Sequence, residues 1–215
     1  MKIAIDGTAA SGKGTLSDNL SKELKLPRLD TGLLYRKLAF MFVNSIKLSP
    51  TQNTIDSSIL KSILNDFDLN DLEPETLKQD LYGNFASRIG KLDFVRNKLK
   101  IIQLEFVENM MKKKGGCILD GRDIGTEILP NADFKFYIDA PIETRAKRRY
   151  KQLYSTNKSI KFKNILLDLK KRDINDKSRK NSPLILSEDS ILIDTELLNA
   201  HQVLKKALYY IKKNK

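Results

Sequence analysis

The sequence predicts an α/β fold of three layers, in which helices cover both faces of a five-stranded parallel sheet. Five short apolar runs alternate with helical segments, an order typical of parallel strands joined by crossover helices. A glycine-rich turn connects the first apolar run to the first helical segment. The chain has 215 residues, 40% of them hydrophobic and 31% charged, which suits one domain with a sizeable core.

The first 50 residues predict two strands and two helices. Residues 2–6 are an apolar run that stops at the glycine-rich turn, which indicates a buried strand. Leucines recur at helical spacing between residues 13 and 25 and predict the first helix. After a short second strand at 27–30, Thr31 is placed to cap a second helix, and the proline of residues 48–50 ends that helix.

The remaining elements follow from the same patterns. Residues 49–82 have a different, more acidic composition and predict short helices in an inserted segment. A further short helix is predicted over 82–91, and a long one over 93–113 that two glycines end. The later strands are predicted at three apolar runs, residues 117–120, 134–139 and 190–194. The later helices are predicted over residues 142–154 and 161–178, and up to about residue 212 near the end of the chain.

Composition excludes several classes of protein. The single cysteine, Cys117, rules out an internal disulfide framework and a multi-cysteine zinc site, and it suits a reducing compartment. No apolar run is long enough to cross a bilayer and the N-terminus lacks the layout of a signal peptide, so we expect a cytoplasmic protein. We expect Cys117 in the core and His201 at the surface.

The net charge of +12 is local rather than diffuse. Residues 145–180 carry 14 lysines and arginines against three aspartates, which accounts for nearly all of the excess. A basic segment of this kind is compatible with nucleic-acid binding, but only three aromatic residues lie in it and their spacing is helical. Its position therefore calls for a local explanation.

Residues 7–15, Gly-Thr-Ala-Ala-Ser-Gly-Lys-Gly-Thr, have the features of a phosphate-binding loop. Such a loop needs glycines for close approach, backbone N–H groups that face an anion, a helix N-terminus behind them and a lysine at its end. The alternative is a glycine-rich turn that binds nothing, and the strand–turn–helix context argues against it. Gly14 separates Lys13 from Thr15, so the usual hydroxyl contact with Mg²⁺ is less direct here.

Four other clusters carry polar groups that a second substrate could use. They are residues 30–36 (DTGLLYR), Ser87 with Arg96, residues 120–126 (DGRDIGT) and residues 172–179 (RDINDKSR). In an open α/β sheet, the loops that follow the first three strands can meet at one crevice. With the phosphate loop and the segment RAKRRYKQL (145–153), these clusters make the chain resemble the bacterial cytidylate kinases, a family of P-loop nucleoside monophosphate kinases, over nearly its whole length. The ending Gly-Lys-Gly-Thr is itself usual in this group of kinases.

The resemblance implies a reaction and a set of residues for it. It implies that ATP donates its γ-phosphate to CMP or dCMP, with Mg²⁺ as the cofactor. It implies a single kinase domain with a core at 1–48, 83–144 and 181–215, a short helical acceptor insert at about 49–82 and a basic lid at about 145–180. ATP binding is assigned to the phosphate loop and the lid, namely Gly7, Thr8, Ala9, Ala10, Ser11, Gly12, Lys13, Gly14, Thr15 and Arg149.

The family pattern also assigns the acceptor residues. Cytosine recognition falls to Thr31, Ser87, Arg96 and Asp123. Arg36, Arg122 and Arg179 correspond to positions that hold the acceptor phosphate, and Arg172 with Asp176 to the pair that engages the ribose. The catalytic set is Lys13, Arg122, Arg179 and Arg148. Thr15 and Asp120 are assigned to the metal ion, which they would contact through water.

The chemistry of these side chains supports the assignment. Cytosine offers an amino donor and two acceptors, which match one carboxylate together with arginine and hydroxyl donors. The planar guanidinium of arginine donates two parallel bonds to phosphate. Several of these residues also have an ordinary structural alternative. Arg172 and Asp176 could form an exposed i,i+4 ion pair, and Arg36 could belong to a buried ion pair. Asp123 could orient Arg122, Asp120 could bond to its own loop, and Thr31 and Ser87 could cap helices.

Two competing functions remain to be distinguished. Adenylate and uridylate kinases typically have Phe-Pro-Arg after the third strand, where this chain has Gly121-Arg122-Asp123. A nucleic-acid-binding P-loop protein would show salt-sensitive affinity for polynucleotides.

The insert is shorter and more helical than in many members of the family. We expect a monomer whose partners are ATP and CMP or dCMP, with no nucleic acid and no membrane.

Overall fold

A five-stranded sheet confirms the predicted fold class. The computed structural model describes residues 1–45, 55–69, 74–77, 80–155 and 157–213. The strand order is β2-β3-β1-β4-β5, with β1 paired in parallel to β3 and β4, and β4 paired in parallel to β5. The strands are Lys2–Gly7 (β1), Arg28–Asp30 (β2), Cys117–Gly121 (β3), Phe134–Asp139 (β4) and Ile191–Asp194 (β5).

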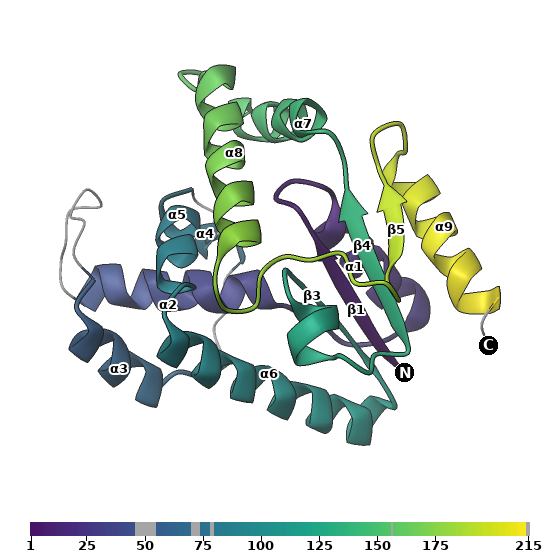
Figure 1. Ribbon diagram of the computed structural model, residues 1–215, viewed down its shortest axis with the longest axis horizontal. Coiled ribbons are helices and arrows are strands. Elements are labelled where there is room, and N and C mark those ends of the chain that lie inside the picture. Colours follow the sequence, from purple (N-terminus) through teal and green to yellow (C-terminus); the bar gives the residue numbers. More distant parts are fainter. Residues whose placement is uncertain (46–54, 70–73, 78–79, 156, 214–215) are drawn as a thin grey trace. The chain divides into compact units, whose positions relative to one another are not determined.

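Strand β1 lies at the centre of the sheet and its apolar side chains are buried. Ile3 and Ile5 are fully buried in a cluster with residues of β3, β4 and β5. Helices α1 (Lys13–Leu24) and α9 (Ala200–Lys213) contribute Leu16, Leu20 and Val203 to the same cluster. Because β1 is held on both sides, the turn that follows Gly7 starts from a fixed position at the carboxyl end of the sheet (Figure 1).

The basic segment forms two helices that pack against each other. Helices α7 (Ile142–Tyr154) and α8 (Phe162–Ser178) follow β4 and lie against each other (Figure 1). They share an apolar cluster with Ala9 of the phosphate loop. The aromatic rings of this segment serve that packing, since Tyr150 stacks on Tyr154 at 5.2 Å between centroids and meets Phe162 edge-on at 6.1 Å. These three rings therefore pack against one another, and Tyr154 keeps 38% of its surface exposed.

The chain divides into two compact units, residues 1–29 with 110–215, and residues 30–109. The second unit is helical and has its own core, in which α2 packs on α5 and Phe42 stacks on Phe85 at 5.3 Å between centroids. Its helices are α2 (Thr31–Ser45), α3 (Ser57–Asn65), α4 (Pro74–Leu77), α5 (Asp80–Ile89) and most of α6 (Asp93–Lys114). The boundaries predicted for core, insert and lid stay a prediction.

The predicted elements agree with the structure to within a few residues. The short helices expected in the acidic segment are α3 and α4, whereas the helix end expected at residues 48–50 lies outside the described part of the chain. A one-turn π-helix, η1 (Ile124–Ile128), was not predicted. Cys117 is fully buried, and burial raises the pKa of its thiol to about 11, while His201 is exposed. No helix among the described residues combines the length and apolar content needed to cross a membrane.

Candidate active site

The loop between β1 and α1 adopts a backbone that depends on its glycines. A Cβ on Gly7 would lie 2.1 Å from the Ile138 carbonyl oxygen, so only glycine fits beside β4. Gly12 caps α1 with φ +100°, a left-handed conformation that side chains disfavour, and Ala10 has φ +61°. The turn therefore brings its backbone close to the sheet and places the N-terminus of α1 directly behind it, as anion binding requires.

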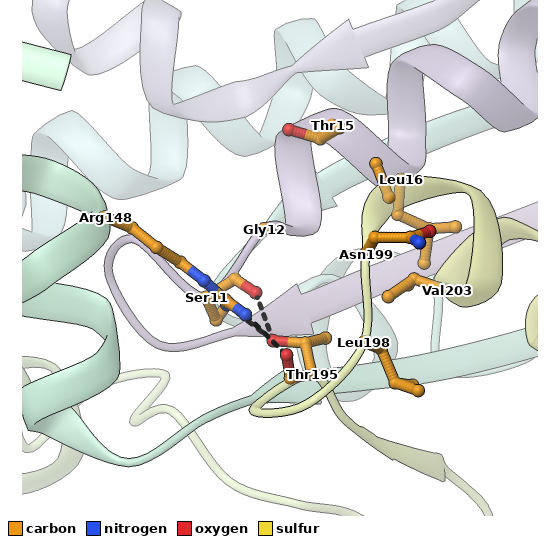
Figure 2. Close-up of a pocket in the computed structure, with 10 residues that line it drawn as sticks. Ser11, Gly12, Thr15, Leu16, Arg148, Thr195, Leu198, Asn199 and Val203 are labelled. Atoms are coloured by element: carbon orange, nitrogen blue, oxygen red, sulfur yellow. Dashed lines mark hydrogen bonds between the residues drawn. The ribbon is translucent and has the colours of Figure 1, made fainter. Parts of the chain in front are cut away.

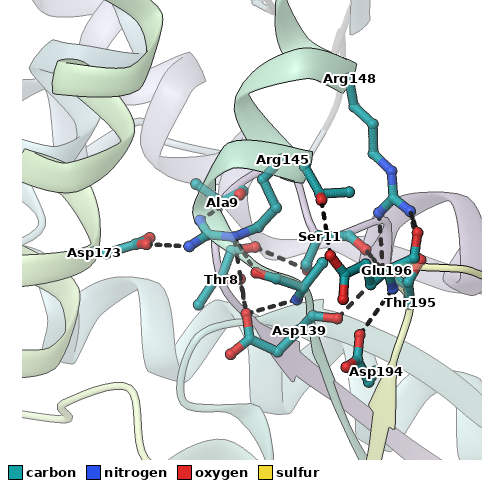
Figure 3. Close-up of polar contacts among 12 residues, drawn as sticks. Thr8, Ala9, Ser11, Asp139, Arg145, Arg148, Asp173, Asp194, Thr195 and Glu196 are labelled. Atoms are coloured by element: carbon teal, nitrogen blue, oxygen red, sulfur yellow. Dashed lines mark hydrogen bonds and ion pairs between the residues drawn. The ribbon is translucent and has the colours of Figure 1, made fainter.

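Asp139 at the end of β4 and Thr195 just after β5 form hydrogen bonds with oxygen atoms of this loop (Figure 3). The Thr8 hydroxyl donates to Asp139 Oδ1 at 2.6 Å, and the Ser11 hydroxyl donates to the Thr8 carbonyl at 3.0 Å. Thr195, which follows β5 and is 2% exposed, donates its hydroxyl to the Ser11 carbonyl at 2.9 Å. Carbonyls fixed in this way leave the loop shaped to present amides to an anion.

Lys13 and Thr15 lie in the first turn of α1, and Asp120 of β3 lies close to that turn. Lys13 is the first residue of the helix, and Thr15, in the same turn, is exposed. Asp120 on β3 is 1% exposed, and its Oδ2 lies 3.8 Å from the position that a Cβ on Gly14 would take. The other oxygen lies 3.6 Å from the Arg28 guanidinium. One carboxylate and one hydroxyl beside a phosphate loop fit Mg²⁺, which keeps several waters and takes its other ligands from phosphates.

The described residues contain no group of three or more His, Cys, Asp or Glu side chains that could hold a metal ion by themselves. An ion at this loop would therefore depend on the bound nucleotide for most of its ligands.

A pocket of about 250 Å³ opens beside the phosphate loop (Figure 2). Its apolar wall comes from Leu16 of α1, Leu198 and Val203, and Arg148 of α7 closes another side. The Arg148 guanidinium donates to the Thr195 hydroxyl at 2.9 Å and to the Thr195 carbonyl. A largely apolar pocket of this volume, with one guanidinium on its wall, has the size and chemistry for a single nucleobase.

The other arginines of α7 differ in their surroundings. Arg145 is 4% exposed and donates to the Ala9 carbonyl of the phosphate loop at 3.0 Å and to Asp173 of α8 at 2.6 Å (Figure 3). Arg149, assigned to ATP, donates to the Gln152 side chain at 2.9 Å on the same helix. Arg145 thus links three segments, although the family pattern in the sequence drew attention to Arg148 and Arg149.

The loop after β3 is joined to the end of α8 by two ion pairs. Arg122 Nε donates to Asp176 Oδ2 at 2.8 Å, and Arg179 Nη2 lies 3.5 Å from Asp123 Oδ1. Burial opposes the ionisation of Asp176, but the neighbouring arginines, first among them Arg122, outweigh it and lower its pKa. The Asp176 side chain is only 14% exposed, so this carboxylate is more than a member of a surface pair along the helix. Arg172 lies one turn earlier on α8.

Asp6 at the end of β1 holds the same loop by its backbone. Its two carboxylate oxygens accept from the Ile124 N–H at 2.8 Å and the Gly125 N–H at 2.7 Å. The residue is 5% exposed, and burial raises the pKa of this carboxyl to about 6 although both hydrogen bonds lower it. Asp6 thereby positions the residues that directly follow Arg122 and Asp123.

The other four predicted acceptor residues lie in the second unit. Thr31 begins α2 and is buried, and Ser87 is half-buried on α5. Arg36 on α2 donates to the Leu77 carbonyl at 2.7 Å, and its Nη2 lies 2.7 Å from where a Cβ on Gly83 would be. Arg96 on α6 is 8% exposed, donates to the Gly90 carbonyl at 3.2 Å and lies over the Tyr35 ring. The structure thus places the predicted acceptor residues in two sets, one in each unit.

Sequence reasoning missed four residues that support the site: Asp6, Asp139, Arg145 and Thr195. Each acts through a partner more than 100 positions away in the chain. The presence of an aspartate in the first strand and of three arginines in RAKRRYKQL was visible, but no periodicity or local spacing indicates contacts at that range.

Comparisons with known proteins agree with this geometry. The family model described as cytidylate kinase matches residues 3–213. A cytidylate kinase of Xanthobacter autotrophicus is 37% identical over 208 residues, covering 97% of this chain and 95% of the relative. One from Bartonella bacilliformis is 40% identical over 205 residues, covering 95% and 91%. Among solved structures, an uncharacterized protein from Eubacterium ventriosum shares the fold at a TM-score of 0.54 and 14% identity, covering 99% of this chain and 98% of that chain.

Proposed function

This chain belongs to the cytidylate kinase family, and from that premise we propose that it transfers the γ-phosphate of ATP to CMP or dCMP, giving ADP and CDP or dCDP. The observation that carries this conclusion is the family match over residues 3–213. The phosphate loop between β1 and α1 supports it independently. Phosphoryl transfer passes through a loose transition state, so alignment and charge neutralisation supply most of the catalysis.

The donor occupies the phosphate loop and the pocket beside it. The loop amides and Lys13 hold the β- and γ-phosphates, and residues 7–15 with Arg149 make the remaining ATP contacts. The base lies in the pocket between Arg148 and the apolar wall of Leu198 and Val203. This placement gives Arg148 a contact with the donor base in addition to the catalytic role predicted for it.

The residues predicted for the acceptor divide by role. Thr31, Ser87, Arg96 and Asp123 recognise cytosine, because together they offer one carboxylate acceptor with hydroxyl and guanidinium donors. Arg36, Arg122 and Arg179 bind the acceptor phosphate, and Arg122 and Arg179 also neutralise charge in the transition state. Arg172 and Asp176 engage the ribose. The bond from Arg122 to Asp176 supports this division, since it joins a phosphate residue to a ribose residue.

Thr15 and Asp120 would hold Mg²⁺ through water, and the bound ion would neutralise charge on the β- and γ-phosphates. The helices α7 and α8 act as the lid, which excludes water from the reacting phosphates and so suppresses hydrolysis of ATP. No general base is required for this reaction, because the acceptor is already an anionic phosphate. The enzyme acts in the cytoplasm as a monomer whose partners are its nucleotides.

A coupled assay of ADP release tests the proposal with ATP and CMP, dCMP, UMP or AMP as acceptors. We expect turnover with CMP and dCMP, and preference for AMP would contradict the acceptor assignment. Lys13→Met should lower kcat by about 100-fold or more, because a cation that meets the transferring phosphoryl group is lost. Lys22→Met on the exposed side of the same helix is the matched control and should keep full activity.

A further inference from the structure

Arg145 is a buried cation whose guanidinium contacts three separate segments. Its Nε donates to the Ala140 carbonyl at 2.8 Å, at the junction of β4 and α7. Its Nη1 donates to the Ala9 carbonyl of the phosphate loop at 3.0 Å, and its Nη2 to Asp173 Oδ2 on α8 at 2.6 Å. Figure 3 shows the Arg145 side chain reaching from α7 to Ala9 on one side and to Asp173 on the other. Burying a guanidinium is unfavourable unless it is paired and hydrogen-bonded, so these contacts must form together.

The bond to Ala9 sets the direction of a peptide group in the phosphate loop. A trans peptide is planar, so the Ala10 N–H points away from the Ala9 carbonyl and hence away from Arg145. Ala9 also packs its methyl group against Ala146 of α7 and against Ile165 and Leu169 of α8. The apex of the loop therefore contacts both helices, through one polar bond and through apolar packing.

Asp173 connects the same guanidinium to the acceptor residues of α8. It follows Arg172 directly and precedes Asp176 by three positions, and Asp176 accepts from Arg122. The Asp173 side chain is 13% exposed, and within the described part of the chain its Oδ1 is buried without a hydrogen-bond partner. The carboxylate thus depends on Arg145 for its main contact, and a movement of Arg145 would displace Asp173 and the neighbouring part of α8.

We propose that Arg145 and Asp173 are positioning residues that couple donor binding at the phosphate loop to acceptor binding on α8. The proposal rests on the proposed function, since it takes ATP to bind the loop and CMP to contact Arg172 and Asp176. A triphosphate that orders the Ala9–Ala10 peptide also orders Arg145, and through Asp173 it orders α8 before CMP arrives. The binding free energy of the first ligand therefore offsets the loss of conformational entropy in the shared contacts, so the second ligand binds more tightly.

This coupling is reciprocal by thermodynamic necessity, so CMP must strengthen ATP binding by the same factor. Neither Arg145 nor Asp173 is required to touch a substrate. Their loss should change how the two affinities depend on each other more than it changes either affinity alone.

Calorimetric titration of CMP, with and without a saturating non-hydrolysable ATP analogue and Mg²⁺, measures the coupling as a ratio of two Kd values. We expect a ratio of about tenfold for the natural chain, within the range usual for coupled sites. Asp173→Asn should bring the ratio close to one, with the Kd of the analogue alone changed by less than about threefold. Matched controls are Asp168→Asn on α8 and Lys151→Gln on α7, both exposed, which should keep the natural ratio.

Asp173→Asn leaves Arg145 with Asp139, whose Oδ1 lies 3.9 Å from its Nε, as the remaining carboxylate partner, and the weaker pairing can reduce stability. The double variant Arg145→Met/Asp173→Leu removes both charges, so it tests the coupling without a buried unpaired ion, and thermal unfolding confirms that it is folded. In either variant KM for CMP at saturating ATP should rise towards the Kd of CMP for the free enzyme, with a smaller change in kcat.

A folded double variant that keeps the natural ratio would overturn the coupling. Failure of the natural chain to bind or phosphorylate CMP would instead contradict the proposed function, so the two failures are distinguishable.

Discussion

The buried carboxyl of Asp6 makes a prediction about stability that depends on pH. Its pKa is raised from 3.8 to about 6 in the folded chain, chiefly by burial. Below about pH 3 the group is protonated in both the folded and the unfolded chain, and it favours neither. As the pH rises from 4 to 6, the unfolded chain releases this proton first, so the group's contribution to the free energy of unfolding falls. The loss is complete above about pH 7 and amounts to roughly 3 kcal/mol, at 1.36 kcal/mol for each pKa unit.

Urea unfolding of the natural chain and of Asp6→Asn between pH 4 and pH 8 isolates this effect. Asparagine cannot accept both the Ile124 and the Gly125 N–H bonds, so a constant loss of about 1–3 kcal/mol is expected at every pH. On top of this offset, the advantage of the natural chain should shrink by roughly 3 kcal/mol between pH 4 and pH 7.

A control variant, Asp18→Asn, should show the opposite trend. The hydrogen bond from Lys22 lowers the pKa of exposed Asp18, so its stabilisation is present at neutral pH and lost in acid. Parallel stability curves for the natural chain and Asp6→Asn would refute the argument, and so would a carbon-detected NMR titration that placed the Asp6 carboxyl at its ordinary pKa.

Three further predictions concern the loop, the acceptor residues and the donor pocket. Gly7→Ala should destabilise the fold by more than about 2 kcal/mol, because its Cβ would lie 2.1 Å from the Ile138 carbonyl oxygen. Gly12→Ala, with open space around it but φ +100°, should lose only about 1–2 kcal/mol, and the two melting temperatures should differ accordingly. Gly83→Ala should displace the end of the Arg36 side chain and raise KM for CMP by about tenfold at nearly unchanged melting temperature, whereas an unchanged KM would argue against the role of Arg36. Thr195→Val removes the bond to the Ser11 carbonyl and the hydroxyl that accepts from Arg148, although the Thr195 carbonyl still accepts from Arg148. Initial rates should show KM for ATP raised by about 5- to 100-fold and KM for CMP unaltered.

Strands, helices and the phosphate loop could be predicted, because each depends on residues that are close together in the sequence. Strand β4 was predicted at its observed bounds, and α7 likewise, because apolar runs and helical spacing are set by neighbours in the chain. The phosphate loop was visible for the same reason, since its glycines, its lysine and the start of the helix behind it lie within nine residues. The predicted roles of the individual site residues stay predictions until substrates are measured.

Long-range support could not be predicted from the same patterns. Arg145 was one of three arginines in a basic helix, and nothing in its spacing distinguishes it from Arg149. Its role depends on a loop 136 positions earlier and a helix 28 positions later, which only the tertiary fold brings together. The pairing of Arg122 with Asp176 across 54 positions is a similar case, although the family resemblance had assigned both residues to the acceptor.

The concentrated charge of residues 145–180 separates by residue type in the structure. Arg145, Arg148 and Arg179 lie in hydrogen-bonded networks around the loop and the end of α8. The nine lysines of the segment are all exposed, namely Lys147, Lys151, Lys158, Lys161, Lys163, Lys170, Lys171, Lys177 and Lys180. This division follows from chemistry, because a planar guanidinium can satisfy several acceptors at once while an ammonium group is best solvated. The arginines therefore set the geometry of the site. The lysines contribute a positive field over α7 and α8, and such a field attracts anions without fixing where they bind.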